Sequence, residues 1–417
     1  MSTADPQSVG LDPDALAKID AAVQADIDAG RHFGAAILVA RGGHVAHRAN
    51  LGTVAPGRAA ADGDLYQLQS MSKAYTAALV LRAVDEGRFT LDTRVADLVP
   101  DYGRYGKTTA TVRQLLCHTA GLPAAPVAPP LPLTAMGQLR RHSNAICRLK
   151  DIYEPGTRCV YTSGTGYDML GRILIDTDPK GRGFNQIARE ELFEPLGLSN
   201  TSFGLGPHNR RRVPVAFTAS ATTPVSAKLS TIFNTVIDEQ AAYPCAGAFA
   251  DVDDVFAWTE ALQGRSPHGY RVISGELFAE ARTNQTGDMP LEALMVTGPP
   301  AIRQLAKTFG IPTLIKQIRF TRQAVKSGTD AYQAPVYPAN FTLLGGYTRG
   351  VGDFLTTAGR SASPNALSAM GGGSTGWMID PQRDLTFIFL SAGMVEGFAH
   401  PRRLERLADL AIAAVRD

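Results

Sequence analysis

A serine and a lysine three residues apart, Ser70 and Lys73, are the residues of this 417-residue chain whose types and spacing best suit chemistry. A serine hydroxyl becomes an effective nucleophile only when a base removes its proton. Residues three apart share one face of a helix, so an unprotonated Lys73 amine would lie beside the Ser70 hydroxyl and act as that base. The spacing predicts acyl transfer at a helix start, whose positive end favours negative charge on Ser70. A serine helix cap with a solvated lysine is the alternative.

The residues around this pair favour the catalytic interpretation. No other lysine in the sequence has a serine three residues before it. A helix pattern follows Ser70 and ends near Glu86 and Gly87. Its positions after Lys73 are strongly apolar, which indicates a buried helix: Ala74, Ala77, Leu79, Val80, Leu81 and Val84. We therefore expect Lys73 to lie at a buried helix start.

The elements that must position this pair come from both ends of the chain. Helix patterns cover residues 12–30 and the C-terminal stretch that opens with Pro401. Four strand-like runs form two hairpins, residues 33–40 with 44–50 and residues 375–379 with 385–391. Two terminal hairpins, each beside a terminal helix, predict one antiparallel sheet assembled from both chain ends.

The fold class that follows is α+β. The sheet and its terminal helices would form an α/β subdomain from about residues 10–95 and 345–417, and residues 96–344 would form a large, mainly helical inserted subdomain. We expect both parts to make one catalytic domain over residues 1–417. Residues 265–345 lack a clear period, which indicates an irregular insertion or a lid.

Composition and charge exclude several classes of function. The 41 basic and 39 acidic residues give a net charge of +2, which offers no general electrostatic footprint for nucleic acid or an anionic membrane. Residues 1–20 have neither a basic start nor an apolar core, so we expect no secretory signal. No apolar run reaches the ~18 residues that a membrane span needs. Cytoplasmic localisation is therefore the default expectation.

Three further features suggest structural roles. The run Arg210–Arg212 predicts a solvated loop, and Trp258 lies on an apolar helical stretch that predicts a core position. The cysteines are widely spaced, with no Cys-x-x-Cys pair and no grouping with histidine, so we expect free thiols in a reducing compartment and no metal site. They are Cys117, Cys147, Cys159 and Cys245.

Several motifs occur in a characteristic order along the chain. They are Gln69–Lys73 (QSMSK), Glu86–Asp92 (EGRFTLD), Thr111–Pro123 (TVRQLLCHTAGLP), Tyr161–Tyr167 (YTSGTGY), Pro195–Leu198 (PLGL) and Ala246–Phe249 (AGAF). Across about residues 10–265 and 365–417, the sequence resembles the serine β-lactamase and penicillin-binding-protein superfamily. The order and spacing of the motifs are similar to those of the class C-like branch, particularly the family VIII carboxylesterases. The resemblance implies a β-lactamase-like fold.

The resemblance implies that Tyr161 is the third catalytic residue. Its phenol would share a proton network with Lys73 and Ser70 and then protonate the leaving group. The family pattern is often Tyr-x-Asn, whereas this chain has Ser163 at the third position. The Ser163 hydroxyl can still form a hydrogen bond with substrate, but it lacks the separate donor and acceptor ends of an asparagine amide. His118 falls in a segment that the resemblance assigns to a structural helix–loop turn.

The third family element, Lys-Thr-Gly, is absent from this sequence. The matching segment is Gly371–Gly376 (GGGSTG), which looks like the Trp-Gly-Gly or His-Gly-Gly versions of family VIII esterases, with Gly371 at the cation position. The resemblance implies an oxyanion hole made by the backbone N–H groups of Ser70 and Ser374. The segment also fits G-x-S-x-G, but no helix pattern follows it, so we do not expect Ser374 to be a nucleophile. Further substrate contacts would come from Gly372, Gly373 and Trp377.

Together these features predict a serine hydrolase that cleaves a carboxylic ester through an acyl-enzyme on Ser70, with no metal or organic cofactor. The missing lysine removes a cation that would bind the carboxylate of β-lactams and peptides, which favours small-molecule esters; Arg319 or Arg349 is a candidate substitute. The alternatives are an acyltransferase, or a hydrolase of amides, β-lactams or D-amino-acid peptides, on the same scaffold. A non-catalytic ligand-binding relative is a third. We expect no nucleic-acid or membrane partner and leave a homo-oligomer open.

Overall fold

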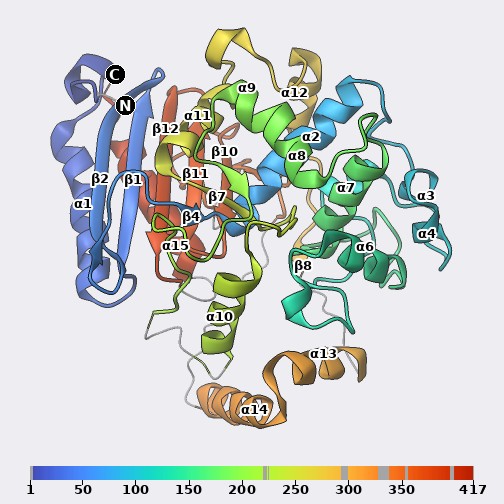
Figure 1. Cartoon of the computed structure of the whole chain (residues 1–417). Helices are drawn as coiled ribbons and strands as arrows, with labels where there is room; N and C mark the ends of the chain where they lie inside the picture. Colours follow the sequence, from blue (N-terminus) through green and yellow to red (C-terminus); the bar gives the residue numbers. More distant parts are fainter. Residues whose placement is uncertain are drawn as a thin grey trace.

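A seven-stranded antiparallel sheet joins the two ends of the chain in the computed structural model (Figure 1). The structure describes residues 3–218, 223, 225–292, 299–326, 338–352, 356–394 and 399–416. The strand order is β3-β2-β1-β12-β11-β10-β9, so the prediction of an antiparallel sheet built from both chain ends is confirmed. The bounds are β1 Gly34–Arg41, β2 His44–Ala55, β3 Arg58–Ala59, β9 Tyr347–Thr348, β10 Leu367–Gly371, β11 Thr375–Asp380 and β12 Leu385–Ala392.

Both faces of this sheet are apolar and covered by helices. Along β1, Ile37 and Val39 join one buried cluster, whereas Leu38 and Ala40 join the other. Successive side chains of a strand point to opposite faces, so the unbroken apolar run of β1 is buried on both sides. The first face is covered by the terminal helices α1 (Pro13–Asp28) and α15 (Ala399–Ala413), and the second by α2 (Ser72–Asp85) and α11 (Val252–Leu262).

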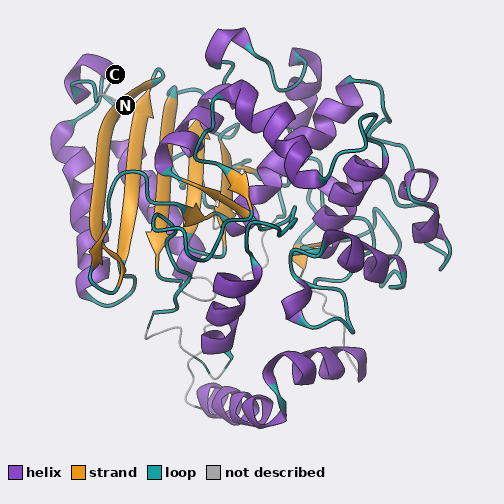
Figure 2. Ribbon diagram, viewed as in Figure 1, coloured by secondary structure: helices purple, strands orange, loops and turns teal. Residues whose placement is uncertain are grey.

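The middle of the chain is mainly helical and lies beside the sheet (Figure 2). One small sheet connects it to the rest: β4 (Tyr66–Gln67) with β7 (Ala248–Ala250) and β6 (Ser202–Phe203). The parallel pair β5 (Cys159–Val160) and β8 (Leu291–Glu292) lies within the middle part. The helices are α3 Val95–Leu98, α4 Pro100–Gly103, α5 Val112–Leu116, α6 Leu139–Cys147, α7 Thr165–Asp176, α8 Phe184–Ala188, α9 Glu194–Leu196, α10 Ser226–Val236, α12 Gly275–Ala281, α13 Pro299–Phe309 and α14 Ile311–Lys326. Shorter turns are η1 Pro6–Val9, η2 Gln69–Met71, η3 Leu133–Ala135, η4 Arg189–Phe193 and η6 Pro267–Gly269.

One expectation about the middle of the chain needs correction. The segment 265–345 was expected to be irregular, but its described part contains α12, α13 and α14. Residues 96–344 are otherwise mainly helical, and their helix α11 packs against β1 and β12 of the sheet. Its Trp258 is 1% exposed, which confirms the predicted core position.

The Arg210–Arg212 run is only partly the solvated loop that its charge predicted. Arg210 and Arg211 are exposed, but Arg212 is buried and lies over the ring of Phe249. Its guanidinium donates to the carbonyl groups of Ile237 at 3.0 Å and Phe233 at 2.9 Å. A buried arginine is stable where carbonyl oxygens satisfy its donors, so Arg212 ties this loop to the helices around it.

The four cysteines are free and buried, as the spacing predicted. Among the helices that the structure describes, none has both the length and the apolar character needed to cross a bilayer.

Candidate active site

Ser70 lies in a tight turn between a short strand and a buried helix. β4 pairs with β7, and the following residue, Leu68, donates its N–H to the Ala248 carbonyl at 2.8 Å. Gln69 then adopts a left-handed backbone with φ of 47° before α2 begins at Ser72. A non-glycine residue in this conformation stores strain of about 1–2 kcal/mol, which the paired strand and the buried helix must hold. The turn leaves Ser70 only partly buried while its neighbours are covered.

Lys73 points its amine at the Ser70 hydroxyl from the first turn of α2. It is 2% exposed, which agrees with the expected buried helix start. Its Nζ lies 3.3 Å from Ser70 Oγ and donates to the backbone carbonyls of Ser163 at 2.9 Å and Cys245 at 3.0 Å. Two carbonyls therefore fix two directions of the amine, and the remaining one faces Ser70. None of these three partners carries a charge, so Lys73 lies among dipoles rather than in an ion pair.

Tyr161 also contacts the Ser70 hydroxyl. Its hydroxyl donates to Ser70 Oγ at 2.7 Å, and Lys73 Nζ lies 5.0 Å from the centre of its ring. Tyr161 follows β5 directly, and its N–H donates at 3.1 Å to the carbonyl of Glu292, the last residue of β8. The structure thus brings together the three residues for which the sequence predicted catalysis. Ser163 contributes its backbone carbonyl to Lys73, while a role of its hydroxyl in substrate binding stays a prediction.

His118 packs against Tyr161, a neighbour that its motif did not reveal. It is 1% exposed, and its ring centre lies 4.7 Å from that of Tyr161 and 4.5 Å from that of Phe341. The Thr162 N–H donates to His118 Nδ1 at 3.2 Å. Burial, with a smaller contribution from Lys73, lowers the pKa of His118 well below its usual value. A neutral imidazole therefore supports the segment that carries Tyr161, which extends the structural role expected for this turn.

Buried neutral histidines make the fold sensitive to acid. Burial lowers the pKa of His400 to about 3 and that of His32 to about 4, from 6.5. Below pH 6.5 the unfolded chain binds protons on these rings, whereas the folded chain does not. The free energy of unfolding therefore decreases as the pH is lowered. The loss is about 1.4 kcal/mol per ring for each pH unit, or about 2 kcal/mol per ring at pH 5.

We expect His400→Phe to remove one such contribution. The difference in the free energy of unfolding between pH 7 and pH 5 should shrink by about 2 kcal/mol relative to wild type. Urea unfolding at the two pH values measures it. An identical difference in the two proteins would show that His400 is not kept neutral by the fold.

The glycine-rich segment forms a tight hairpin between β10 and β11. The Ser374 N–H donates to the Gly371 carbonyl at 3.0 Å, and Ser374 has a left-handed φ of 64°. This hydrogen bond closes the turn, so the Ser374 amide is not free to bind an oxyanion. The expectation that Ser374 supplies the second oxyanion donor is therefore wrong. Sequence alone could not show this, because the pairing of Gly371 with Thr375 decides which amides form hydrogen bonds within the hairpin.

Gly371 and Trp377 also lie differently from expectation. Gly371 packs against the Leu68 carbonyl two residues before Ser70, so its position has no room for a side chain. Gly372 is exposed and Gly373 is buried, both beside the side chain of Gln69. Trp377 was expected to offer an apolar surface to the acyl group. It is 3% exposed within the main core cluster, so it supports β11 and is not a wall of the site.

Replacement of Gly371 should disturb the position of Ser70. A Cβ atom there would lie 2.1 Å from the Leu68 oxygen, so one of the two backbones must move. We expect Gly371→Ala to destabilise the protein by about 1–3 kcal/mol and to lower kcat for esters. Gly372→Ala is the matched control, because its Cβ would meet only the end of the Gln69 side chain, 2.7 Å away. Equal melting temperatures and rates for the two variants would contradict this packing.

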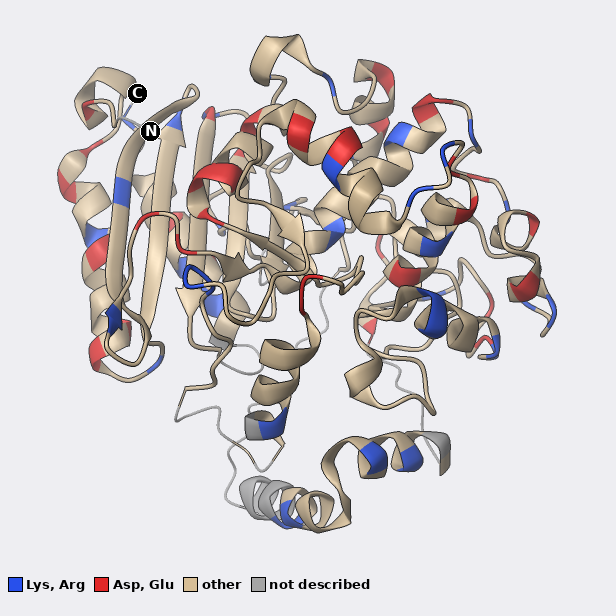
Figure 3. Cartoon of the chain, in the orientation of Figure 1, with Lys and Arg blue, Asp and Glu red and all other residues tan. Residues whose placement is uncertain are grey.

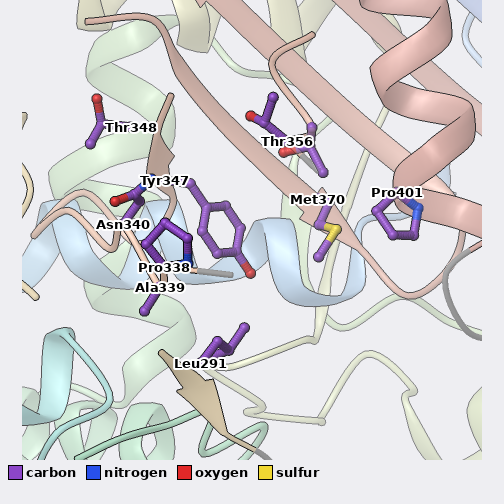
Figure 4. A pocket seen from close by; sticks show the side chains of 10 residues that line it. Leu291, Pro338, Ala339, Asn340, Tyr347, Thr348, Thr356, Met370 and Pro401 are labelled. Carbon is purple, nitrogen blue, oxygen red and sulfur yellow. The ribbon is translucent and has the colours of Figure 1, made fainter. Parts of the chain in front are cut away.

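A pocket lies between residues of β8, β9 and β10 and the segments next to them (Figure 4). The space inside it that is open to the centre of a water molecule is about 40 Å³. Leu291 and Tyr347 on its wall share a small apolar cluster with Tyr161, and the Tyr347 ring packs on Phe341, which stacks on Tyr161. The described lining residues carry no charge, so the pocket suits a neutral group. They are Leu291, Pro338, Ala339, Asn340, Tyr347, Thr348, Thr356, Thr357, Met370 and Pro401.

The two arginines proposed as substitute cations lie elsewhere. Arg349 is buried, and its guanidinium donates to the carbonyls of Gly350, Gly352 and Arg360. Arg319 lies exposed on α14. Neither lines the pocket among the residues described for it. Within the described parts of the chain, no three histidine, cysteine or acidic residues gather in a cluster that could hold a metal ion.

Comparison with known proteins places this arrangement in a family. The sequence profile of the family described as Beta-lactamase matches residues 19–412, nearly the whole chain. The chain belongs to the beta-lactamase family. Among curated relatives, this family member is 31% identical over 250 residues to penicillin-binding protein 4 of Amycolatopsis lactamdurans. That alignment covers 58% of this chain and 62% of the relative, so the chain spans less than two thirds of the relative's length.

Solved structures of the beta-lactamase fold match almost the full length of this family member. One is EstCE1, described as a hydrolase with promiscuous acyltransferase activity, at 19% identity and a TM-score of 0.68, over 95% of this chain and 98% of that one. Another is a family VIII carboxylesterase, at 18% identity and a TM-score of 0.67, over 96% and 98%. These likenesses confirm the β-lactamase-like α+β fold that the motifs predicted.

Proposed function

We propose that this chain is a serine hydrolase that cleaves neutral carboxylic esters through an acyl-enzyme on Ser70. The observation that carries the proposal is the convergence of two proton-transfer groups on one hydroxyl: Tyr161 OH at 2.7 Å and Lys73 Nζ at 3.3 Å from Ser70 Oγ. Such distances suit direct proton transfer between the nucleophile and its partners. The family and the likeness to a family VIII carboxylesterase add support.

The proposed reaction proceeds in two halves. Ser70 Oγ attacks the ester carbonyl carbon while its proton passes to Lys73, and a tetrahedral oxyanion forms. The bond to the alcohol oxygen then breaks, and Tyr161 donates a proton to the leaving alkoxide and regains one from Lys73. Water repeats the sequence on the acyl-enzyme, which releases the acid and restores Ser70.

For the oxyanion we propose the N–H groups of Ser70 and Met370. Polar groups of successive residues in an antiparallel strand point to alternate edges. Gly371 directs its carbonyl to the hairpin with β11, so the Met370 N–H points to the opposite edge of β10. On that edge β9 pairs only with Leu367 and Ser368, and β10 packs against η2, which carries Ser70. Met370 also lines the neutral pocket, which supports this assignment.

The uncharged pocket predicts a preference for neutral substrates. A substrate carboxylate would lose hydration without gaining a paired cation, which costs several kcal/mol in a partly dry site. We expect kcat/KM for a neutral aryl ester to exceed that for nitrocefin by at least ~100-fold, or about 2.7 kcal/mol in transition-state stabilisation. Parallel assays with p-nitrophenyl esters, nitrocefin and D-amino-acid amides measure this. Nitrocefin turnover as efficient as ester turnover would refute the neutral-pocket argument.

Labelling with a fluorophosphonate tests the nucleophile directly. Mass spectrometry should locate the label on Ser70, whereas a non-catalytic ligand-binding protein would not be labelled there. Product analysis in the presence of an added alcohol separates hydrolysis from acyl transfer, since a transferase would return a new ester instead of the acid. The four buried free thiols support the proposed cytoplasmic localisation.

A further inference from the structure

Helices α13 and α14 lie at the periphery of the molecule (Figure 1). Both carry exposed aliphatic side chains. Ile302 and Ile311 are 63% and 65% exposed, which is unusual for isoleucine in a folded protein. Leu305, Ile315 and Ile318 are exposed as well. The α14 members recur at the first, fifth and eighth positions of the helix, so they share one face.

These exposed aliphatic residues are not left over from an unfilled core, because α13 packs on the body through other residues. α13 is fixed to the body by other positions: Gln304 Nε2 donates to the Val127 carbonyl at 2.7 Å, and Thr308 Oγ1 accepts from the Leu133 N–H at 3.1 Å. Phe309 at its end is 2% exposed. The inward face of α13 therefore contacts the body of the protein, and its outward face exposes Ile302 and Leu305 to water. A water-exposed row of this kind indicates an interaction surface.

The charge of the same segment identifies the partner. Residues 299–326 contain no aspartate or glutamate. Figure 3 accordingly shows basic but no acidic residues on the described parts of α13 and α14. The near-neutral charge of the whole chain conceals this local excess. The basic residues are Arg303, Lys307, Lys316, Arg319, Arg322 and Lys326.

We propose that α13 and α14 dock onto the surface of an anionic lipid bilayer. Aliphatic side chains flanked by lysine and arginine are the composition of helices that lie in the headgroup region, where the apolar face enters the acyl boundary and the cations meet acidic headgroups. A second copy of the chain is a poorer partner, because two such surfaces would bring like charges together. In this proposal the two helices lie on the membrane surface and do not span the bilayer.

Vesicle flotation with the full chain tests this surface without any substrate, so its result is independent of the proposed hydrolysis. We expect binding to phosphatidylcholine vesicles with about 30% phosphatidylglycerol, at least tenfold weaker binding to phosphatidylcholine alone, and weaker binding at high salt. A variant with Ile311→Ser, Ile315→Ser and Ile318→Ser should lose at least tenfold in bound fraction. Lys316→Gln with Arg319→Gln should lose binding severalfold and flatten the salt dependence.

The matched control is Ile152→Ser, which removes an exposed isoleucine outside these helices. It should bind vesicles as the wild type does, and all variants should keep the circular dichroism spectrum of the wild type. Failure of the wild type to float with anionic vesicles would overturn the proposal. So would undiminished flotation of both the triple and the double variant. Loss of a dimer by light scattering in the triple variant, with no vesicle binding by the wild type, would assign the surface to a second copy instead.

Discussion

Ser70→Ala should reduce ester hydrolysis by about 10⁴-fold or more while the protein stays folded. The variant lacks the atom on which Tyr161 and Lys73 converge, so no acyl-enzyme can form. The lost hydroxyl is small and partly exposed, so we expect little change in stability. Steady-state rates with a p-nitrophenyl ester, together with intact-protein mass spectrometry of the trapped acyl-enzyme, measure both parts of this prediction.

Ser72→Ala is the matched control for the nucleophile. Ser72 lies two residues further on, is fully buried, and accepts a hydrogen bond from the Ala248 N–H at 3.0 Å. Its loss should lower stability by about 1 kcal/mol through the unsatisfied amide, with most activity retained. If folded Ser70→Ala protein kept most of the wild-type activity, the proposed mechanism would be excluded.

Lys73→Ala should lower kcat by about 10²–10⁴-fold, the range expected for loss of a positioned base. The substitution also leaves a cavity and two buried carbonyls without their donor, so a stability loss accompanies it. Lys73→Met keeps most of the side-chain volume and separates the two effects. We expect it to recover part of the stability and none of the activity.

Ser163→Ala serves as the control for the base. Ser163 holds Lys73 through its backbone carbonyl, which the substitution keeps, so the variant should retain the ionisation of the base in the pH profile of kcat. The pH dependence of kcat completes the test, since loss of the base removes one ionisation from the profile. An unchanged kcat and pH profile for Lys73→Met would show that Lys73 has no part in proton transfer.

The sequence determined the features that depend on neighbours along the chain. Helical geometry places residues three apart on one face, and Lys73 does lie beside Ser70. The turn between β1 and β2 and the one between β11 and β12 follow from short polar segments between apolar runs, and the sheet contains both hairpins. The apolar stretch after Lys73 predicted a buried α2, because a helix that is apolar all round has no solvent face.

Tertiary structure alone decided the features that join distant parts of the chain. Tyr161 is 91 residues from Ser70 in sequence, and only the folded structure places their oxygens 2.7 Å apart. Every residue of β11 is buried, so alternation along the strand could not show that Trp377 faces the core and not the pocket. The register of β10 on β11 likewise decides that the Ser374 amide forms a hydrogen bond within the hairpin. Spacing fixes which residues share a face of an element, whereas the neighbouring elements decide whether that face meets core, substrate or water.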